Sequence, residues 1–292
     1  MTGKRGFTVI FSAAVIVGIY RLWSLPPALE KGQTDNYWVI ANNLLDGKGY
    51  SFCYDLYFPF CDGARPTAMR EPIPTFLFAA AGAISGRSLM AALVVQLLAY
   101  LAALWLLHRW VRKRHGERIA LIAAFFWAAC LIAIQTVPQL SGDLVGTALF
   151  LGACVLFDEA LETDRTKHWI LTGVVLGLSA LSRSVLLFSL LPWAWIVWRK
   201  LSGRSAVQRS RSIIVLTLAT LITLSPWIIR NHNTFGRYYA GTSMNGYNLF
   251  RNAHPAAHDE PPHYVGEREA RAILDDFLAR HTELRGDENE GE

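Results

Sequence analysis

The sequence predicts an all-α integral membrane protein with about seven transmembrane helices and a large helical first outer loop. Two observations predict this fold class. Of the 292 residues, 52% are hydrophobic and only 17% are charged, whereas soluble domains carry about 25% charged residues. The apolar residues also gather in long runs between positions 7 and 229. This pattern excludes a disordered chain, a disulfide-stapled miniprotein and a soluble enzyme.

Seven apolar ranges are the predicted membrane spans, since a spanning helix needs roughly 20 mostly apolar residues. An eighth apolar range, 74–86, is short and begins with Pro74. Its length is typical of an interfacial or re-entrant segment, and we predict that it does not span. The seven predicted spans are 7–23, 88–107, 119–137, 144–157, 169–181, 185–198 and 213–229.

The distribution of positive charge predicts the orientation, because cytoplasmic loops carry the excess of Lys and Arg. With the N-terminus inside, the inner segments hold half of the 28 Lys and Arg residues, whereas the short outer connections 138–143 and 182–184 hold only Arg183. We therefore expect a bacterial inner or plasma membrane protein with a cytoplasmic N-terminus and an outer C-terminus. The inner segments are 1–6, 108–118, 158–168 and 199–212.

This topology also accounts for the net charge of +5 and the isoelectric point near 9.1. The basic residues lie between apolar spans, so we expect no nucleic-acid partner. Lys4 and Arg5 before an apolar stretch resemble a signal peptide, but no small-residue cleavage site follows before Pro26. The first span is therefore expected to be a retained signal anchor.

Two long segments are predicted to face outward. Range 24–87 is expected to carry structure, including a helix over 36–46 that ends at Gly47. Its apolar face is typical of a helix lying on the membrane. The second segment begins at Arg230 and has an amphipathic stretch over 267–284 and an acidic end over 286–292. We divide the chain into a transmembrane region, 1–252, and an outward-facing soluble tail, 253–292.

Common cofactor motifs are missing from the sequence. It has no phosphate-binding loop, dinucleotide fingerprint, nucleophile elbow or metal-ligand spacing of His and Cys. We therefore expect no cofactor, and a divalent metal has no support in the sequence. The small-residue pattern Gly173-x-x-x-Gly177 favours helix packing rather than chemistry.

The four cysteines fall into two groups. Cys130 and Cys154 lie within predicted spans and are typical small core residues. Cys53 and Cys61 both lie in the first outer loop, in a compartment that permits disulfides. The sequence leaves two alternatives open: Cys53 and Cys61 form a disulfide, or both are free thiols.

Two carboxylates are candidates for acid–base chemistry. Asp35 lies at the start of the helix predicted over 36–46, where it could deprotonate a hydroxyl or simply cap the helix. Asp143 lies where the chain enters the fourth predicted span. It could be functional, as carboxylates at membrane depth often are, or it could cap that span.

Basic residues at the outer ends of the spans are candidates for phosphate binding. Arg70 and Glu71 precede 74–86, and the prolines at 72 and 74 are expected to disfavour a helix there. Arg183 lies between the fifth and sixth spans, and Arg230 and Asn231 follow the seventh. Arginine suits bidentate phosphate binding, although Arg70 could contact lipid phosphate and Arg230 could be an interface anchor. Together, these charges favour a lipid-phosphate substrate.

The order of these residues resembles glycosyltransferases of the GT-C fold. More narrowly, the chain resembles bacterial relatives of the protein O-mannosyltransferases and lipid A aminoarabinose transferases, that is, glycosyltransferase family 39. The resemblance covers about residues 7–252. Its motifs are Thr34-Asp35-x-Tyr37, Ala41-x-Asn43-Leu-Leu45-x-Gly47-x-Gly49-Tyr50, Arg70-x-Pro72-x-Pro74, Gly177-Leu-x-x-Leu181-x-Arg183, Pro226-Trp227-x-x-Arg230-Asn231 and Gly246-Tyr-Asn248.

The resemblance implies a sugar transferase of the cell envelope that works on the outer face of the membrane. Its donor would be a polyprenyl-phosphate-linked sugar, its acceptor a lipid, glycan or protein, and transfer would invert the anomeric carbon. It implies that Asp35 is the general base and that Asp143 is a second catalytic carboxylate. It implies that Arg70, Arg183 and Arg230 hold the donor phosphate.

The chain departs from these relatives in two respects. Many carry a second acidic residue where this chain has Asn36. They also continue through further spans, so we expect this chain to be a fragment or shortened form that lacks the C-terminal part. The alternative functions are a non-catalytic protein that binds lipid-linked sugar, a scaffold for another membrane protein, and a transporter. A transporter would place polar residues at mid-membrane, whereas these charges gather at span ends.

Overall fold

The computed structural model describes residues 3–24, 36–52, 64–238, 240–243, 249 and 267–280, and most of them are helical. Within these ranges the one extended pairing is an isolated antiparallel bridge between Ser51 and Pro66. The all-α fold class is therefore confirmed. The helices are α1 Gly3–Trp23, α3 Asn36–Leu45, α4 Pro72–Ser85, α5 Leu89–Ala128, α6 Leu131–Thr136, α7 Asp143–Thr163, α8 Thr166–Ala180, the 3₁₀ helix η1 Ser184–Ser189, α9 Leu190–Lys200, α10 Ala206–Phe235 and α12 Glu267–Arg280.

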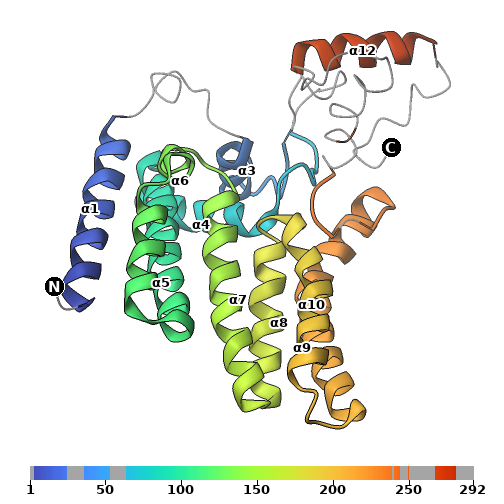
Figure 1. Cartoon of the computed structure of the whole chain (residues 1–292). Helices are drawn as coiled ribbons and strands as arrows, with labels where there is room; N and C mark the ends of the chain where they lie inside the picture. Colours follow the sequence, from blue (N-terminus) through green and yellow to red (C-terminus); the bar gives the residue numbers. More distant parts are fainter. Residues whose placement is uncertain are drawn as a thin grey trace.

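The long helices run side by side as a bundle, and α3, α4 and α6 lie at one of its ends (Figure 1). The helix α5 is a hairpin, because Gly116 adopts a φ of 81° and reverses the chain. Tyr100 and Trp127 tie its two arms together: the Tyr100 hydroxyl donates to the Ala128 carbonyl at 3.0 Å, and the Trp127 indole donates to the Tyr100 carbonyl at 3.2 Å. The two arms carry the second predicted span and most of the third.

Within the described ranges, four helices are long and apolar enough to cross a membrane: α1, α5, α7 and α10. The remaining predicted spans fall on shorter apolar helices, α8 and the consecutive η1 and α9. The chain is thus an integral membrane protein of helical type. The number of seven crossings stays a prediction, and so does the division at residue 252.

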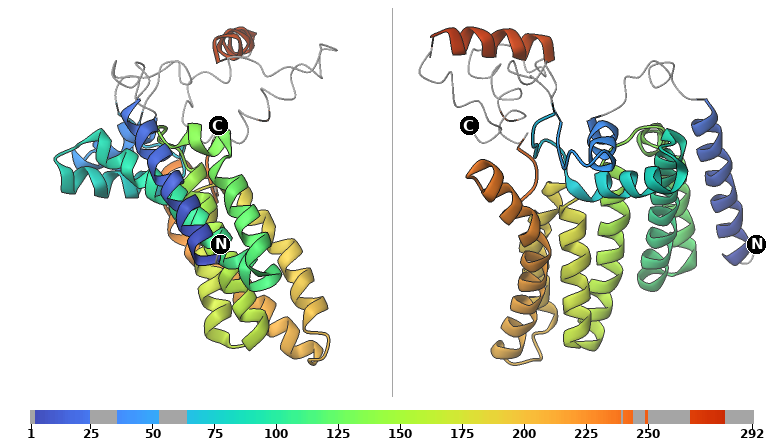
Figure 2. Two further views of the ribbon diagram at one scale, coloured as in Figure 1. Left: turned by 60° about the vertical axis from the view of Figure 1, so that its left-hand side comes forward. Right: turned by 180° about the vertical axis from the view of Figure 1, so that it is seen from behind.

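The loops of the bundle gather at two ends (Figures 1 and 2). We call one the basic end; it comprises 108–118, 158–168 and 199–212 together with the start of α1. We call the other the α3 end; it comprises 36–52, 64–75, 140–146, 181–184, 227–238 and 240–243. The helix α4 lies across the α3 end and does not run along the bundle (Figure 2). That range 74–86 does not cross the membrane stays a prediction.

The helix α3 forms where it was predicted and ends at Gly47, whose φ is 74°. However, its apolar face does not lie on the membrane as expected. Tyr37, Ile40 and Ala41 are buried in the protein, and Tyr37 and Ala41 share a core cluster with Phe78 of α4. The contact is close: a Cβ on Gly82 of α4 would lie 3.2 Å from the side chains of Leu45 and Trp38.

The expectation that prolines disfavour a helix next to Arg70 was wrong. The helix α4 begins at Pro72 and includes Pro74. Both prolines fall in the first helical turn, where backbone N–H groups have no partner within the helix and a fixed φ suits the start. The prolines therefore fix where α4 begins, with Glu71 as its N-cap residue.

The predicted role of Gly173 and Gly177 in helix packing is confirmed. A Cβ on Gly173 would lie 2.5 Å from the Leu216 carbonyl oxygen, and one on Gly177 would lie 2.6 Å from the Thr223 Cβ. Both contacts are made by α10, so the two glycines let α8 and α10 approach closely. Such small-residue contacts are a common basis of helix association in membranes.

We expect Gly173→Ala to lower the free energy of unfolding by about 1–3 kcal/mol, because the methyl group has no room between α8 and α10. Gly152→Ala in α7 is the matched control, since a Cβ there would meet its nearest neighbour, Val175, at 3.8 Å. Thermal unfolding in detergent would measure both variants. Equal melting temperatures would contradict the packing role.

Candidate functional site

The α3 end brings together segments that lie far apart in the sequence. A cluster of apolar residues from α3, from 50–52 and 68–69, from α8 and from α10 forms its floor. The polar residues predicted from the sequence lie around this floor, within the part of the chain that the structure describes. They are Arg70 and Glu71 before α4, Asp143 at the start of α7, Arg183 before η1, and Arg230 and Asn231 in α10.

Glu71 and Tyr37 form a buried polar pair at the centre of this end. The Tyr37 hydroxyl donates to Glu71 Oε2 at 2.7 Å, and the Glu71 residue is only 4% exposed. Burial, together with the nearby Glu71 charge, raises the pKa of the Tyr37 phenol well above its usual value. Tyr37 therefore stays protonated and acts as a donor that orients Glu71. The Arg70 guanidinium lies 5.4 Å from the centre of the Tyr37 ring.

Tyr50 fixes the backbone on which Arg70 and Glu71 are carried. Its hydroxyl lies 2.9 Å from the Arg70 carbonyl oxygen, 3.2 Å from the Glu71 carbonyl oxygen and 3.0 Å from Thr75 Oγ1. Burial also raises the pKa of the Tyr50 phenol. The neutral hydroxyl thus holds the start of α4 in place, and with it the direction of the two charged side chains.

Asp143 and Arg183 form an ion pair beside this centre. Arg183 Nη2 lies 2.5 Å from Asp143 Oδ1, and both side chains are 46% exposed. Asp143 is not the N-cap residue of α7, because Gly142 occupies that position. A Cβ on Gly142 would lie 2.2 Å from the Ser182 carbonyl oxygen and 3.2 Å from the Tyr37 hydroxyl. The ion pair and the Glu71–Tyr37 pair are therefore neighbours, as the sequence analysis required of a shared site.

Arg230 has structural contacts that sequence analysis did not predict. Its guanidinium donates to the Thr67 carbonyl at 2.7 Å and to the Tyr50 carbonyl at 3.0 Å. It also donates to Asn231 Oδ1 at 2.9 Å, and Asn231 is fully buried. The two bonds to carbonyls attach the backbone at Tyr50 and Thr67 to α10. Arg230 therefore stabilises the floor of the site through hydrogen bonds within the protein.

The chain after α10 adds a further support. The Trp227 indole donates to the Gly241 carbonyl at 2.9 Å, and the Thr242 hydroxyl donates to the Met69 carbonyl at 2.5 Å. Ser243 N–H donates to the Ala68 carbonyl at 2.9 Å. The backbone just before Arg70 is thus held from two sides.

Gln96 is a residue that sequence analysis missed. It lies fully buried in α5, and its Nε2 donates to the Ser141 carbonyl at 2.7 Å. This bond fixes the connection that carries Asp143. Gln96 Oε1 is buried and makes no hydrogen bond among the described residues. The sequence does contain a signal for Gln96, because a polar side chain inside an apolar span is a candidate functional residue.

Three predicted site residues, Asp35, Cys53 and Cys61, lie outside the described residues. Asn36, which follows Asp35 in the sequence, has its Nδ2 3.7 Å from Met69 Sδ. Of the residues that the structure describes, no group of three or more His, Cys, Asp or Glu side chains could hold a metal ion.

Comparisons with known proteins agree with the resemblance. A sequence model of the family described as dolichyl-phosphate-mannose-protein mannosyltransferase matches residues 65–229, which are more than half of the chain. Arg70, Glu71, Asp143 and Arg183 lie within the matched range. No solved structure was found to match the chain.

One curated relative is the Bacillus subtilis (strain 168) protein named "Putative mannosyltransferase YycA". It is 24% identical over 242 residues, which are 81% of this chain and 33% of the relative. The chain therefore spans about a third of the length of the curated relative that it matches.

Proposed function

Because this chain belongs to the dolichyl-phosphate-mannose-protein mannosyltransferase family, we propose that it transfers a sugar from a polyprenyl-phosphate-linked donor. The observation that carries the proposal is the juxtaposition at the α3 end. The Asp143–Arg183 ion pair lies beside the buried Glu71–Tyr37 pair and Arg70, at the end of a bundle that includes helices long and apolar enough to cross a membrane. This is the level at which the phosphate of a lipid-linked sugar would lie.

In the proposed reaction an acceptor hydroxyl attacks the anomeric carbon of the sugar. The bond from that carbon to the donor phosphate oxygen breaks, and its electron pair leaves with the phosphate. The hydroxyl proton passes to the Asp35 carboxylate, which acts as general base. Attack opposite the leaving phosphate inverts the configuration at that carbon. Asp35 fits this role by its place in the motif Thr34-Asp35-x-Tyr37.

The arginines stabilise the charge that develops on the leaving phosphate. Arg183 is the best placed, because its side chain is 46% exposed and is held by Asp143. Asp143 then keeps the guanidinium in position before the donor arrives, which lowers the cost of ordering it on binding. Arg70 supplies a second cation, and Glu71 accepts hydrogen bonds that orient the site. Arg230 and Asn231 act indirectly, because Arg230 holds the backbone at Tyr50 and Thr67 in place.

The proposed orientation places this site on the outer face of the membrane. The basic end, opposite the α3 end, includes most of the inner segments that carry the excess of Lys and Arg. The N-terminus is then cytoplasmic, and α12 lies on the outer side. Reporter fusions at Gly116 and Gly266 would test this orientation, with inside and outside as the expected results.

A transfer assay tests the function. Membranes from cells that express the chain would receive radiolabelled polyprenyl-phosphate mannose, and label would be counted in the lipid, glycan and protein fractions. We expect label to move into one fraction above the level of membranes without the chain, and polyprenyl phosphate to be released with it.

Two other results would contradict this proposal. Label that stays on the donor in every fraction would favour a binding protein or scaffold, provided that the donor is retained by the purified chain. Equal transfer from a nucleotide sugar, with synthesis of the lipid carrier blocked, would contradict the proposed donor class.

A further inference from the structure

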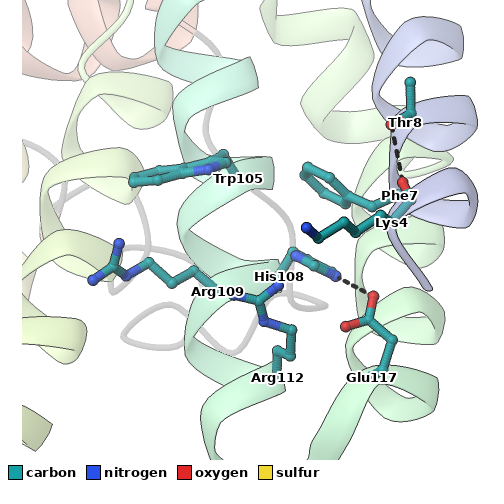
Figure 3. A pocket seen from close by; sticks show the side chains of 8 residues that line it. All are labelled: Lys4, Phe7, Thr8, Trp105, His108, Arg109, Arg112 and Glu117. Atoms are coloured by element: carbon teal, nitrogen blue, oxygen red, sulfur yellow. Dashed lines mark hydrogen bonds and ion pairs between the residues drawn. The ribbon is translucent and has the colours of Figure 1, made fainter. Parts of the chain in front are cut away.

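A cavity lies at the basic end, at the other end of the bundle from the candidate site. It has a volume of about 300 Å³ and lies between the start of α1 and the hairpin of α5 (Figure 3). Cationic side chains line it together with two aromatic rings. They are Lys4, Arg109 and Arg112 with Phe7 and Trp105, and Glu117 is the one carboxylate that lines it.

The charge balance of this cavity favours an anion. Three cations face one carboxylate, which leaves a formal excess of two positive charges with His108 neutral. Lys4 and Arg112 make no ion pair with any residue that the structure describes, and both are exposed. Arg109 has only a distant partner, since its Nη2 lies 3.8 Å from Glu159 Oε1. Two cations are therefore available to bind a ligand.

The wall behind these cations is fixed by packing. His108 is 5% exposed and stacks on Phe7 with ring centres 4.0 Å apart. Its Nε2 lies 3.3 Å from Glu117 Oε1, so the carboxylate is engaged by the imidazole ring (Figure 3). A Cβ on Gly3 would lie 2.2 Å from Glu117 Cγ, which shows how closely α1 covers this side chain. The cavity is thus built from packed residues and is more than a loose group of surface lysines.

We propose that this cavity binds the phosphate group of an anionic membrane lipid. Phosphate oxyanions suit Arg and Lys donors, and basic pockets between membrane helices bind lipid head groups of this kind. The cavity lies at the ends of α1 and α5, two helices long and apolar enough to cross a membrane. Those helices also expose Val9, Leu98 and Trp105, which gives acyl chains an apolar surface next to the bound phosphate. The proposal does not depend on the transferase reaction.

Native mass spectrometry of the purified full chain would test this proposal. The chain would be titrated with phosphatidylglycerol, with phosphatidylcholine as the zwitterionic comparison and glycerol phosphate as the soluble one. We expect bound phosphatidylglycerol, little phosphatidylcholine, and no displacement by glycerol phosphate. Displacement of the lipid by equimolar glycerol phosphate would overturn the assignment to a lipid.

Paired variants locate the site. The double variant Lys4→Gln/Arg112→Gln is expected to bind phosphatidylglycerol roughly 30-fold more weakly, because it removes two contacts to the phosphate. The matched control, Arg5→Gln/Arg118→Gln, removes the same charge from exposed positions at the same end that do not line the cavity. Lys4→Arg/Arg112→Lys keeps the charge and should keep binding. Equal losses in the first two double variants would overturn the proposal.

Discussion

Replacing Asp35 by Asn is expected to lower sugar transfer by about 10²- to 10⁴-fold, the usual contribution of a positioned general base. Asparagine keeps the size and a hydrogen-bond acceptor, so donor binding should change little. The loss should therefore fall on kcat rather than on KM. Initial rates with radiolabelled polyprenyl-phosphate mannose would measure it.

The matched control for this variant is Asp46→Asn, at the other end of α3. Asp46 directly follows the last residue of α3, and its carboxylate is paired with Arg87 at 2.6 Å and Lys48 at 3.3 Å. The hydrogen bond from Arg87 lowers the pKa of Asp46, as expected of an exposed carboxylate with two cationic partners. Asp46→Asn should leave the rate unchanged. Full activity of the Asp35→Asn variant would remove Asp35 as the base.

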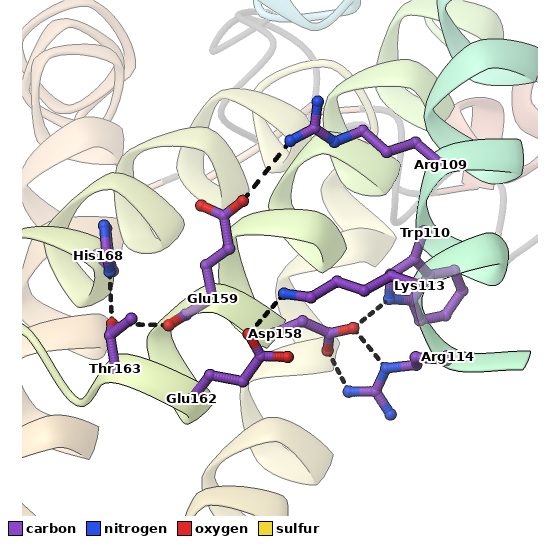
Figure 4. Close-up of polar contacts among 9 residues, drawn as sticks. All are labelled: Arg109, Trp110, Lys113, Arg114, Asp158, Glu159, Glu162, Thr163 and His168. Carbon is purple, nitrogen blue, oxygen red and sulfur yellow. Dashed lines mark hydrogen bonds and ion pairs between the residues drawn. The ribbon is translucent and has the colours of Figure 1, made fainter. Parts of the chain in front are cut away.

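Replacing Arg114 by Met is expected to lower the free energy of unfolding by about 3 kcal/mol, because it leaves a buried charge unpaired. Arg114 forms a bidentate ion pair with Asp158 at the basic end (Figure 4). The side chain of Asp158 is only 5% exposed, whereas that of Arg114 is 44% exposed. The Trp110 indole, which donates to Asp158 Oδ2 at 2.8 Å, would be the one remaining partner among the described residues.

The controls follow from the burial of Asp158, because a pair with two exposed partners should contribute less to stability. Lys113→Met removes an exposed pair with Glu162 at 2.6 Å and should cost at most about 1 kcal/mol. Adding Asp158→Asn to Arg114→Met should restore much of the loss, since the amide oxygen still accepts from Trp110 and the buried charge is gone. Thermal unfolding in detergent would measure all three variants. A Lys113→Met variant as unstable as Arg114→Met would contradict the account.

Hydropathy predicted the helices of this protein well, because the length of an apolar run is a local property of the chain. It placed α1, α7 and α10, and Gly47 correctly marked the end of α3. The hairpin in α5 was predicted from the basic loop 108–118. These features follow from neighbouring residues and from the cost of burying charge in lipid.

The features that were not predicted depend on tertiary contacts between distant parts of the chain. The apolar face of α3 is the same whether lipid or α4 covers it, so the pattern alone could not choose between them. Arg230 bonds carbonyls more than 160 positions away in the sequence, and no local pattern reports such a partner. Likewise, Asp143 and Arg183 were selected one by one, whereas their ion pair depends on how α7 packs on α8.

Photo-crosslinking of the donor would test the central claim most directly, namely that the α3 end binds a polyprenyl-phosphate-linked sugar. A polyprenyl-phosphate mannose analogue with a photoreactive first isoprene unit would be bound to the full chain in detergent, and labelled peptides would be identified by mass spectrometry. The account predicts label in 64–75, 140–146 or 181–184, reduced by unlabelled donor. Label confined to the basic end, at 1–8 or 105–118, or unaffected by unlabelled donor, would contradict it.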